Sequence, residues 1–186
     1  MATMAASLIG KQWMWGAVFP GQGAQYIGMA RNLLAASAKA RHCFEEVDEA
    51  LGYNLTRLCQ NGPDEELNLS ANAQPAILAT SVASFWHFTN TENQFDCEPS
   101  LLLGHSLGEI SALCAAESIN LSSAVQLVRL RGLEMQKASP PDPAMVVVNT
   151  SFAEVFKATD EAQVPHMRIF IEKSLIMQLP FFVYTA

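Results

Sequence analysis

The sequence predicts an α/β fold with a parallel sheet, because short apolar runs alternate along the chain with longer segments of helical periodicity. The first run, residues 15–19 (Trp-Gly-Ala-Val-Phe), ends at Pro20-Gly21 and predicts a buried strand that leads into a glycine-rich turn. The second run, residues 100–104 (Ser-Leu-Leu-Leu-Gly), follows Pro99 and leads directly into a helical segment.

Helical segments surround these runs. Residues 39–51 carry Phe44, Val47 and Leu51 on one stripe, and Gly52 ends the pattern. Pro75 fits the first turn of a long helix over residues 72–88. The remaining expected elements are helices at 25–36, 106–117, 121–138 and 151–158, a turn at 61–64, and strands at 145–149 and 167–171.

Composition narrows the class of protein. The chain has 186 residues, half of them hydrophobic, which is enough for one domain with a substantial core. A net charge of −7 argues against a nucleic-acid partner, which normally requires a basic surface. Every apolar stretch is too short to span a membrane. We therefore expect a soluble enzyme or binding domain.

The cysteines and the N-terminal residues carry little functional signal. Cys43, Cys59, Cys97 and Cys114 show no CxxC spacing, so we expect neither a disulfide framework nor a metal site. Residues 1–16 contain one lysine and no arginine, and they predict no clear targeting segment.

The turn after the second apolar run has the pattern of a serine nucleophile. Residues 104–108 (Gly-His-Ser-Leu-Gly) match GxSxG, with a strand before them and a helix after them. Glycines two residues on either side of Ser106 leave room for a sharp turn that projects the hydroxyl group. GxSxG alone occurs readily by chance, but this context favours Ser106 as a nucleophile.

Four ordered motifs extend this signal. Residues 104–109 (Gly-His-Ser-Leu-Gly-Glu) resemble the GHSxGE signature of malonyl-CoA:acyl-carrier-protein transacylases and related acyltransferase domains. Residues 19–25 resemble the family's FPGQGxQ, residues 74–76 its QPA element, and residues 131–136 its RGxxMQ. The resemblance implies an α/β-hydrolase-like parallel sheet with flanking helices, followed by a small ferredoxin-like subdomain.

The same resemblance implies a ping-pong reaction through a serine ester. Ser106 would accept malonate from malonyl-CoA and pass it to the phosphopantetheine thiol of acyl carrier protein. The backbone N–H of Leu107 and the Gln22 position would form the oxyanion hole. The glycines beside Gln22 allow close backbone approach to a ligand, although for this turn alone a structural hairpin or a helix-capping loop is the preferred explanation.

The position of Arg131 on the predicted helix suggests a role for it independently of the resemblance. It falls inside the apolar arc formed by Leu121, Ala124, Val125, Val128 and Met135, where a cation needs a partner. A guanidinium suits a carboxylate, and the resemblance implies that this carboxylate belongs to malonate. An internal salt bridge or a snorkelling side chain is the alternative.

Two further residues complete the candidate site. Gln74 is expected to line it, by resemblance only. His105 is expected to position or contact substrate, because its side chain leaves the turn on a different side from Ser106. Glu109 lies in the first helical turn, where a carboxylate suits the helix dipole, and it is not assigned a catalytic role.

The downstream part of the pattern departs from the family. Family members activate the serine with a histidine in a GxFHS-like segment, and none of His42, His87, His105 and His166 has that context. The pattern is lost from about residue 165, which suggests a truncated or alternatively spliced product. Because a serine without a base is a poor nucleophile, we expect weak or absent turnover and an open sheet edge.

The predicted organisation is an acyltransferase core over residues 14–140 and the beginning of a small subdomain over 141–186. The alternatives are a serine hydrolase of the α/β-hydrolase type, or an inactive isoform that binds CoA or acyl carrier protein. The expected partners are malonyl-CoA and acyl carrier protein, for a monomer without metal, cofactor, nucleic acid or membrane. The expected compartment is the mitochondrial matrix or the cytoplasm.

Overall fold

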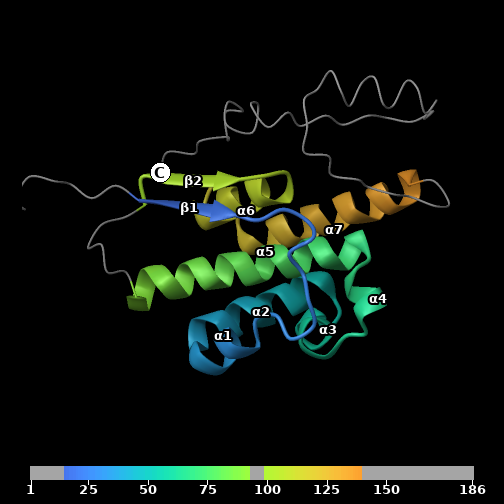
Figure 1. Ribbon diagram of the computed structural model, residues 1–186, viewed down its shortest axis with the longest axis horizontal. Helices are drawn as coiled ribbons and strands as arrows, with labels where there is room; N and C mark the ends of the chain where they lie inside the picture. Colours follow the sequence, from blue (N-terminus) through green and yellow to red (C-terminus); the bar gives the residue numbers. More distant parts are fainter. Residues whose placement is uncertain (1–14, 93–98, 140–186) are drawn as a thin grey trace, which may run out of the picture. The chain divides into compact units, whose positions relative to one another are not determined.

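The computed structural model describes residues 15–92 and 99–139, and the elements below belong to these ranges (Figure 1). The expected elements at 145–149, 151–158 and 167–171, His166 and the small subdomain at 141–186 lie outside the described residues. The observed elements are β1 (Gly16–Phe19), α1 (Arg31–Ala36), α2 (Ala38–Leu51), α3 (Leu55–Asn61), α4 (Asp64–Leu67), α5 (Ser70–His87), the π-helical turn η1 (Phe88–Glu92), β2 (Leu101–Gly104), α6 (Leu107–Ala115) and α7 (Leu121–Ala138).

The two strands pair in parallel, as the alternation of strands and helices predicted. Gly16 lies opposite Leu101 and Phe19 opposite Gly104. The carboxyl ends of both strands therefore meet at one edge, and the loops that follow them carry Gln22 and Ser106. Parallel sheets place ligand sites at this edge.

A helical layer forms the core behind the strands. The helix α5 lies between the strands on one side and α1–α3 on the other (Figure 1). Every residue from Ala71 to Ala79 is buried. Gly132 brings α7 close to the start of α5, since a Cβ at this position would lie 2.4 Å from the Ser70 carbonyl oxygen. This close approach sets the spacing of the two helices that carry Gln74 and Arg131.

The predicted helix at 25–36 was too long. Residues 27–30 form turns and the helix begins at Arg31, because Gly28 (φ +93°) and Ala30 (φ 62°) adopt left-handed backbone conformations. The short helices α3 and α4 were not predicted at all. The expected turn at 61–64 joins them through a cis peptide bond between Gly62 and Pro63.

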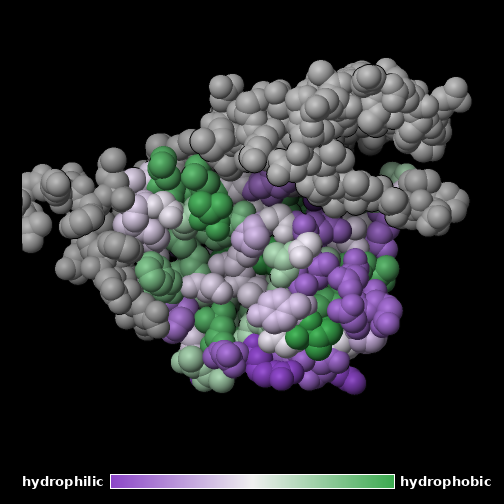
Figure 2. All heavy atoms as spheres, viewed as in Figure 1, coloured by the Kyte–Doolittle hydropathy of each residue, from purple (hydrophilic) through white to green (hydrophobic). Residues whose placement is uncertain are grey.

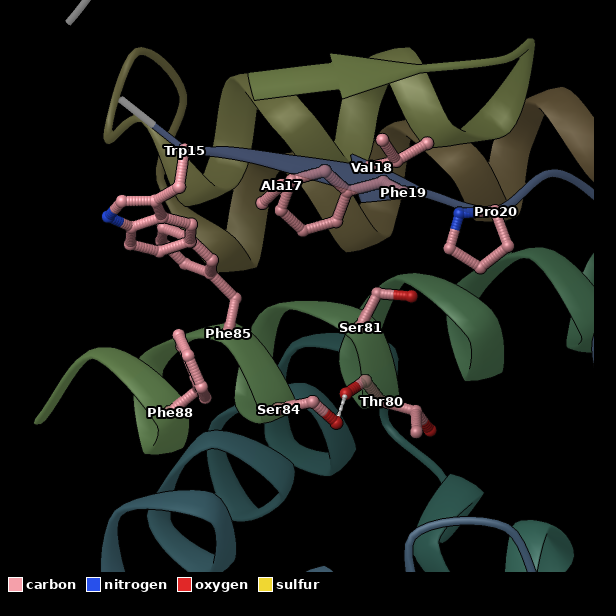
Figure 3. A pocket seen from close by; sticks show the side chains of 10 residues that line it. All are labelled: Trp15, Ala17, Val18, Phe19, Pro20, Thr80, Ser81, Ser84, Phe85 and Phe88. Carbon is pink, nitrogen blue, oxygen red and sulfur yellow. Dashed lines mark hydrogen bonds between the residues drawn. The ribbon is translucent and has the colours of Figure 1, made fainter. Parts of the chain in front are cut away.

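The outer face of β1 is open in the described part of the chain. Val18 is 69% exposed, and Figure 2 shows hydrophobic residues gathered over the strands, in the upper left of the view. A pocket of about 380 Å³ lies between β1 and α5. Figure 3 shows Trp15, Phe85 and Phe88 together at one end of this pocket and Pro20 at the other.

The described helices are also too short or too polar to cross a membrane.

Candidate active site

The candidate nucleophile lies in a strained turn between β2 and α6. Ser106 has φ 55° and ψ −107°, a conformation that costs a non-glycine residue roughly 1–3 kcal/mol. The flanking glycines make the turn possible. A Cβ on Gly104 would lie 2.0 Å from the Gly108 carbonyl carbon, and one on Gly108 would lie 2.1 Å from the Phe19 carbonyl oxygen. The spacing of GxSxG is therefore a steric requirement of this turn.

The hydroxyl of Ser106 does not cap its own helix in the described structure. A serine at this position usually accepts a hydrogen bond from the backbone two or three residues later. Here the Ser106 carbonyl accepts from Glu109 N (3.2 Å), while Oγ accepts from Arg131 Nη2 (2.9 Å). The strained turn thus directs the hydroxyl group toward α7.

Leu107 is the first residue of α6, so its N–H has no carbonyl partner within the helix. Its side chain is buried in the core. The free end of the helix also favours negative charge through its dipole. The backbone at Leu107 is thus suited to stabilise an oxyanion at Ser106, whereas its side chain serves packing.

A chain of hydrogen bonds connects four of the predicted site residues. Arg131 Nη1 donates to Gln74 Oε1 at 2.7 Å, and Gln74 Nε2 donates to Gln22 Oε1 at 3.3 Å. Gln22 Nε2 then donates to Ser70 Oγ at 2.9 Å. Since Arg131 also binds Ser106, the chain runs from the nucleophile to the start of α5.

The direction of this chain is set by Arg131, because a guanidinium only donates hydrogen bonds. The Gln74 side chain must present its oxygen to Arg131, and its nitrogen then faces Gln22. Gln74 is 0% exposed, and its nitrogen also lies 3.2 Å from the Met135 sulfur. The buried amide is therefore held in one orientation.

Arg131 lacks an acidic partner among the described residues. The ion pairs there join His42 to Glu45 and Lys137 to Glu134. The contacts of Arg131 are neutral oxygens of Gln74 and Ser106. An internal salt bridge to Arg131, the alternative at the sequence level, is absent from the described structure. A half-buried cation with neutral partners is suited to bind an anion.

The apolar arc predicted around Arg131 was wrong at one residue. Leu121, Ala124, Val125 and Val128 are buried as expected, but Met135 is 40% exposed. The buried surface of α7 continues through Gly132 instead. The sulfur of Met135 contacts the Gln74 amide at the edge of the site.

His105 is exposed and lies beside Gly21. A Cβ on Gly21 would lie 3.2 Å from His105 Nδ1 and 3.1 Å from the His105 carbonyl oxygen. The His105 ring therefore lies against the loop that carries Gln22. Among the described residues, no hydrogen bond joins this ring to Ser106.

Several contacts of the site could not be found from sequence patterns. Arg129 donates to the Ala71 carbonyl (2.7 Å), to Asn72 Oδ1 and to Tyr53 Oη (3.3 Å), and its guanidinium carbon lies 4.9 Å from the centre of the Tyr53 ring. Gln136 Oε1 accepts from Ala71 N at 2.8 Å. These bonds join residues more than 50 positions apart, so no local pattern reveals them.

The titratable groups of the core are unsuited to nucleophilic chemistry. Burial raises the pKa of Cys43, of Cys59 and of Cys114 to about 12. All three are free thiols and remain protonated near neutral pH. Within the described ranges no cluster of His, Cys, Asp or Glu has the geometry of a metal site.

Comparison with known proteins places this geometry in a family. The acyl transferase domain family matches residues 17–176. The malonyl CoA-acyl carrier protein transacylase of Escherichia coli is 41% identical over 149 residues, which cover 78% of this chain and 47% of that protein. A probable mitochondrial malonyl-CoA-acyl carrier protein transacylase of Drosophila melanogaster is 39% identical over 65% of this chain and 32% of its own length.

Solved structures agree with this result. A malonyl-transacylase in complex with its type II PKS acyl-carrier protein superposes with a TM-score of 0.75 at 38% identity, over 83% of this chain and 50% of that one. The malonyl-CoA:acyl carrier protein transacylase of Xanthomonas oryzae superposes with a TM-score of 0.70 at 41% identity, over 80% of this chain and 47% of that one. This chain spans about half the length of the curated relatives it matches, 47% in the Escherichia coli protein. The chain belongs to the acyl transferase domain family.

Proposed function

We propose that this chain carries the nucleophile and the carboxylate-binding arginine of a malonyl-CoA:acyl-carrier-protein transacylase of fatty-acid biosynthesis. The observation that carries the proposal is the position of Arg131. Its guanidinium touches Ser106 Oγ, and within the described residues it has neutral partners only. A malonyl group presents a thioester carbonyl to the serine and a free carboxylate to the arginine, two functions that match these two side chains.

In the first half-reaction Ser106 Oγ attacks the thioester carbonyl of malonyl-CoA. The bond from that carbon to sulfur breaks, CoA leaves as the thiol, and a malonyl ester of Ser106 remains. In the second half-reaction the phosphopantetheine thiol of the carrier protein attacks the ester. Oγ then leaves as the hydroxyl group, and a thioester to the carrier protein is formed.

Negative charge develops on the carbonyl oxygen in both half-reactions. The N–H of Leu107, at the start of α6, and a donor at the Gln22 position are proposed to stabilise this charge. Gln74 positions both ends of the site, because its amide contacts Gln22 on one side and Arg131 on the other. His105 is proposed to line the entrance, since it is exposed beside Gly21.

Ser106 must also lose its proton when it attacks. Among the described residues, no side chain that could accept this proton lies within hydrogen-bond distance of Ser106 Oγ, whose partner there is the donor Arg131 Nη2. Because the histidines of the sequence lack the GxFHS-like context, the proposal predicts slow acylation for this chain.

The remaining parts of the proposal concern organisation and partners. Residues 14–140 form the acyltransferase core, and 141–186 begin a small ferredoxin-like subdomain. The partners are malonyl-CoA and a carrier protein, a proposal supported by the names of the relatives. The compartment is the mitochondrial matrix or the cytoplasm, supported by the mitochondrial relative in Drosophila melanogaster. The protein acts as a monomer away from the membrane.

The proposal is tested by incubation of the full chain with malonyl-CoA, followed by intact-mass and peptide mass spectrometry. We expect a malonyl adduct on the peptide that contains Ser106, formed slowly and removed on addition of phosphopantetheinylated carrier protein. Ser106→Ala should abolish it, whereas Ser100→Ala, at an exposed serine just before β2, should leave it unchanged.

Three results would contradict the proposal. An adduct that persists in Ser106→Ala would place the acylation elsewhere. Hydrolysis of simple esters without malonyl transfer would identify a serine hydrolase. Binding of CoA or carrier protein by a folded chain that never forms the adduct would identify a non-catalytic binding protein.

A further inference from the structure

The loop between β1 and α1 carries Gln22, yet its backbone is weakly anchored. Outside the strand ladder, residues 20–25 form no backbone-to-backbone hydrogen bond with another described residue. Gln22 and Ala24 are exposed. Gly23 has a φ of +109°, and no atom lies within 4 Å of the position that its Cβ would take. Since glycine-rich backbone has many accessible conformations, the placement of this loop depends on side-chain contacts.

Two side-chain bridges tie this loop to the junction of α4 and α5. Gln22 Nε2 donates to Ser70 Oγ at 2.9 Å. Gln25 Nε2 donates to Asn68 Oδ1 at 2.7 Å, while Gln25 Oε1 accepts from Gly23 N at 2.9 Å. The bridges hold the loop on both sides of Gly23, and each joins residues more than 40 positions apart.

The junction is itself held firmly, so it can serve as an anchor. Asn68 Nδ2 donates to Asp64 Oδ2 at 2.7 Å, and Asn68 N donates to the Asp64 carbonyl at 2.9 Å. The Ser70 carbonyl lies against Gly132, where α7 approaches α5 most closely. Arg131 is the neighbour of Gly132, so the same helix contact fixes both the anchor and the arginine that binds Ser106.

We propose that Asn68 and Ser70 are positioning residues that hold the Gln22–Gln25 loop beside the nucleophile turn. Neither residue is placed in contact with substrate. They act through the amides of Gln22 and Gln25, and their role rests on the proposed function, in which the Gln22 position stabilises the oxyanion. The Ser70 hydroxyl is also the last acceptor in the chain of hydrogen bonds that runs from Arg131 through Gln74 and Gln22.

This role has a kinetic signature. An oxyanion donor acts on the transition state, so a loop that is held less firmly lowers the rate of acylation at saturating malonyl-CoA. The half-saturation concentration should stay nearly constant, because the thioester substrate develops the negative charge only during the reaction. We expect a rate about tenfold lower in Ser70→Ala, since small displacements of catalytic groups are costly.

The test combines the acylation rate of Ser106 with amide hydrogen exchange of the peptide that covers residues 20–25. The informative amide in this peptide is Gly23 N–H, which donates to Gln25 Oε1. Ser70→Ala and Asn68→Ala should raise its exchange rate by about tenfold, the equivalent of one hydrogen bond. Ser70→Thr keeps the hydroxyl group and should restore the wild-type values. Ser84→Ala, on the same helix, and Asn61→Ala, at the exposed end of α3, are the matched controls and should change neither measurement.

Unchanged exchange of the loop in Ser70→Ala and Asn68→Ala would overturn the proposal. So would a failure of Ser70→Thr to restore the loop, because the bridge requires the hydroxyl group. If wild-type protein forms no malonyl adduct, the proposed function fails, while the exchange of the loop still decides the roles of Asn68 and Ser70.

Discussion

The seam between α5 and α7 and the outer face of β1 are two contrasting regions of this molecule. The seam is closed by backbone approach at Gly132 and by hydrogen bonds from Arg129 to the start of α5. The face of β1 leaves Val18 69% exposed above a pocket of about 380 Å³. The hydrogen bond from Arg131 to Gln74 crosses the seam, not the sheet. The placement of Arg131 beside Gln74 therefore depends on how two helices pack, whereas the paired strands bring the loops of Gln22 and Ser106 to one edge.

The largest expected effect on the free energy of unfolding comes from a side chain added where α7 touches α5. A Cβ at Gly132 would lie 2.4 Å from the Ser70 carbonyl oxygen and 2.6 Å from Ala71 Cα, both of them backbone atoms. Gly132→Ala should lower the free energy of unfolding by about 3 kcal/mol, at the upper end of overpacking costs. Urea unfolding followed by tryptophan fluorescence measures the loss.

Gly52→Ala is the matched control for this substitution. Gly52 has a φ of +72° with open space around its Cβ position, so only backbone strain of about 1 kcal/mol is expected. Equal losses at the two glycines would show that the close approach of α7 is not a constraint.

Arg129 gives a smaller effect on the same seam. Arg129→Met keeps the aliphatic stem but removes the donor to Ala71, Asn72 and Tyr53. A hydrogen-bonded charge at a half-buried site contributes roughly 1.5–3 kcal/mol, so we expect a loss of about 2 kcal/mol in unfolding free energy. Lys137→Met breaks an exposed pair with Glu134 and should cost under about 0.5 kcal/mol. Comparable losses in the two variants would contradict this account of the seam.

Alkaline pH tests the helical core. Burial raises the pKa of Cys43, Cys59 and Cys114 from 9.0 to about 12. As the pH approaches 9 the unfolded chain loses these protons first, so the unfolding free energy begins to fall between pH 8 and 9 and keeps falling until about pH 12. We expect a loss of about 1 kcal/mol between pH 8 and pH 9. Urea titrations at both pH values measure this loss, and Cys59→Ala should reduce the slope. A flat profile would show that the thiols ionise normally.

The smallest effect belongs to the open face. Val18→Ala should change the unfolding free energy by under about 0.5 kcal/mol, as expected for an exposed side chain. Val128→Ala, a matched change at a buried position on α7, should cost about 2 kcal/mol. A large loss at Val18, measured by the same urea titration, would mean that the face of β1 is covered in solution.

The sequence predicted the strands and the long helices well where the local signal was strong. The apolar run before Gly104 became β2, and residues 121–138 became α7 without a shift. Prediction failed where backbone conformation decides the outcome. The left-handed residues Gly28 and Ala30 replaced a predicted helix by turns, and side-chain periodicity does not detect such conformations.

The candidate site was predictable where its residues belong to local sequence motifs. The motifs identified Gln22, Gln74, Ser106 and Arg131, and the structure brings these four side chains into one chain of hydrogen bonds. Their catalytic roles remain predictions. The contribution of Ser70 was not predictable, because a bond across 48 positions of sequence arises only from tertiary packing.

The most direct test of the central claim is the ratio of malonyl to acetyl labelling of Ser106, measured by mass spectrometry with malonyl-CoA and acetyl-CoA. Arg131→Ala should lower malonyl labelling roughly a hundredfold, because it removes the partner of the substrate carboxylate. Acetyl labelling should change by less than about threefold, and Arg57→Ala, at an exposed arginine of α3, should leave the ratio unchanged. Equal losses for both acyl groups in Arg131→Ala would contradict the carboxylate-binding role of Arg131.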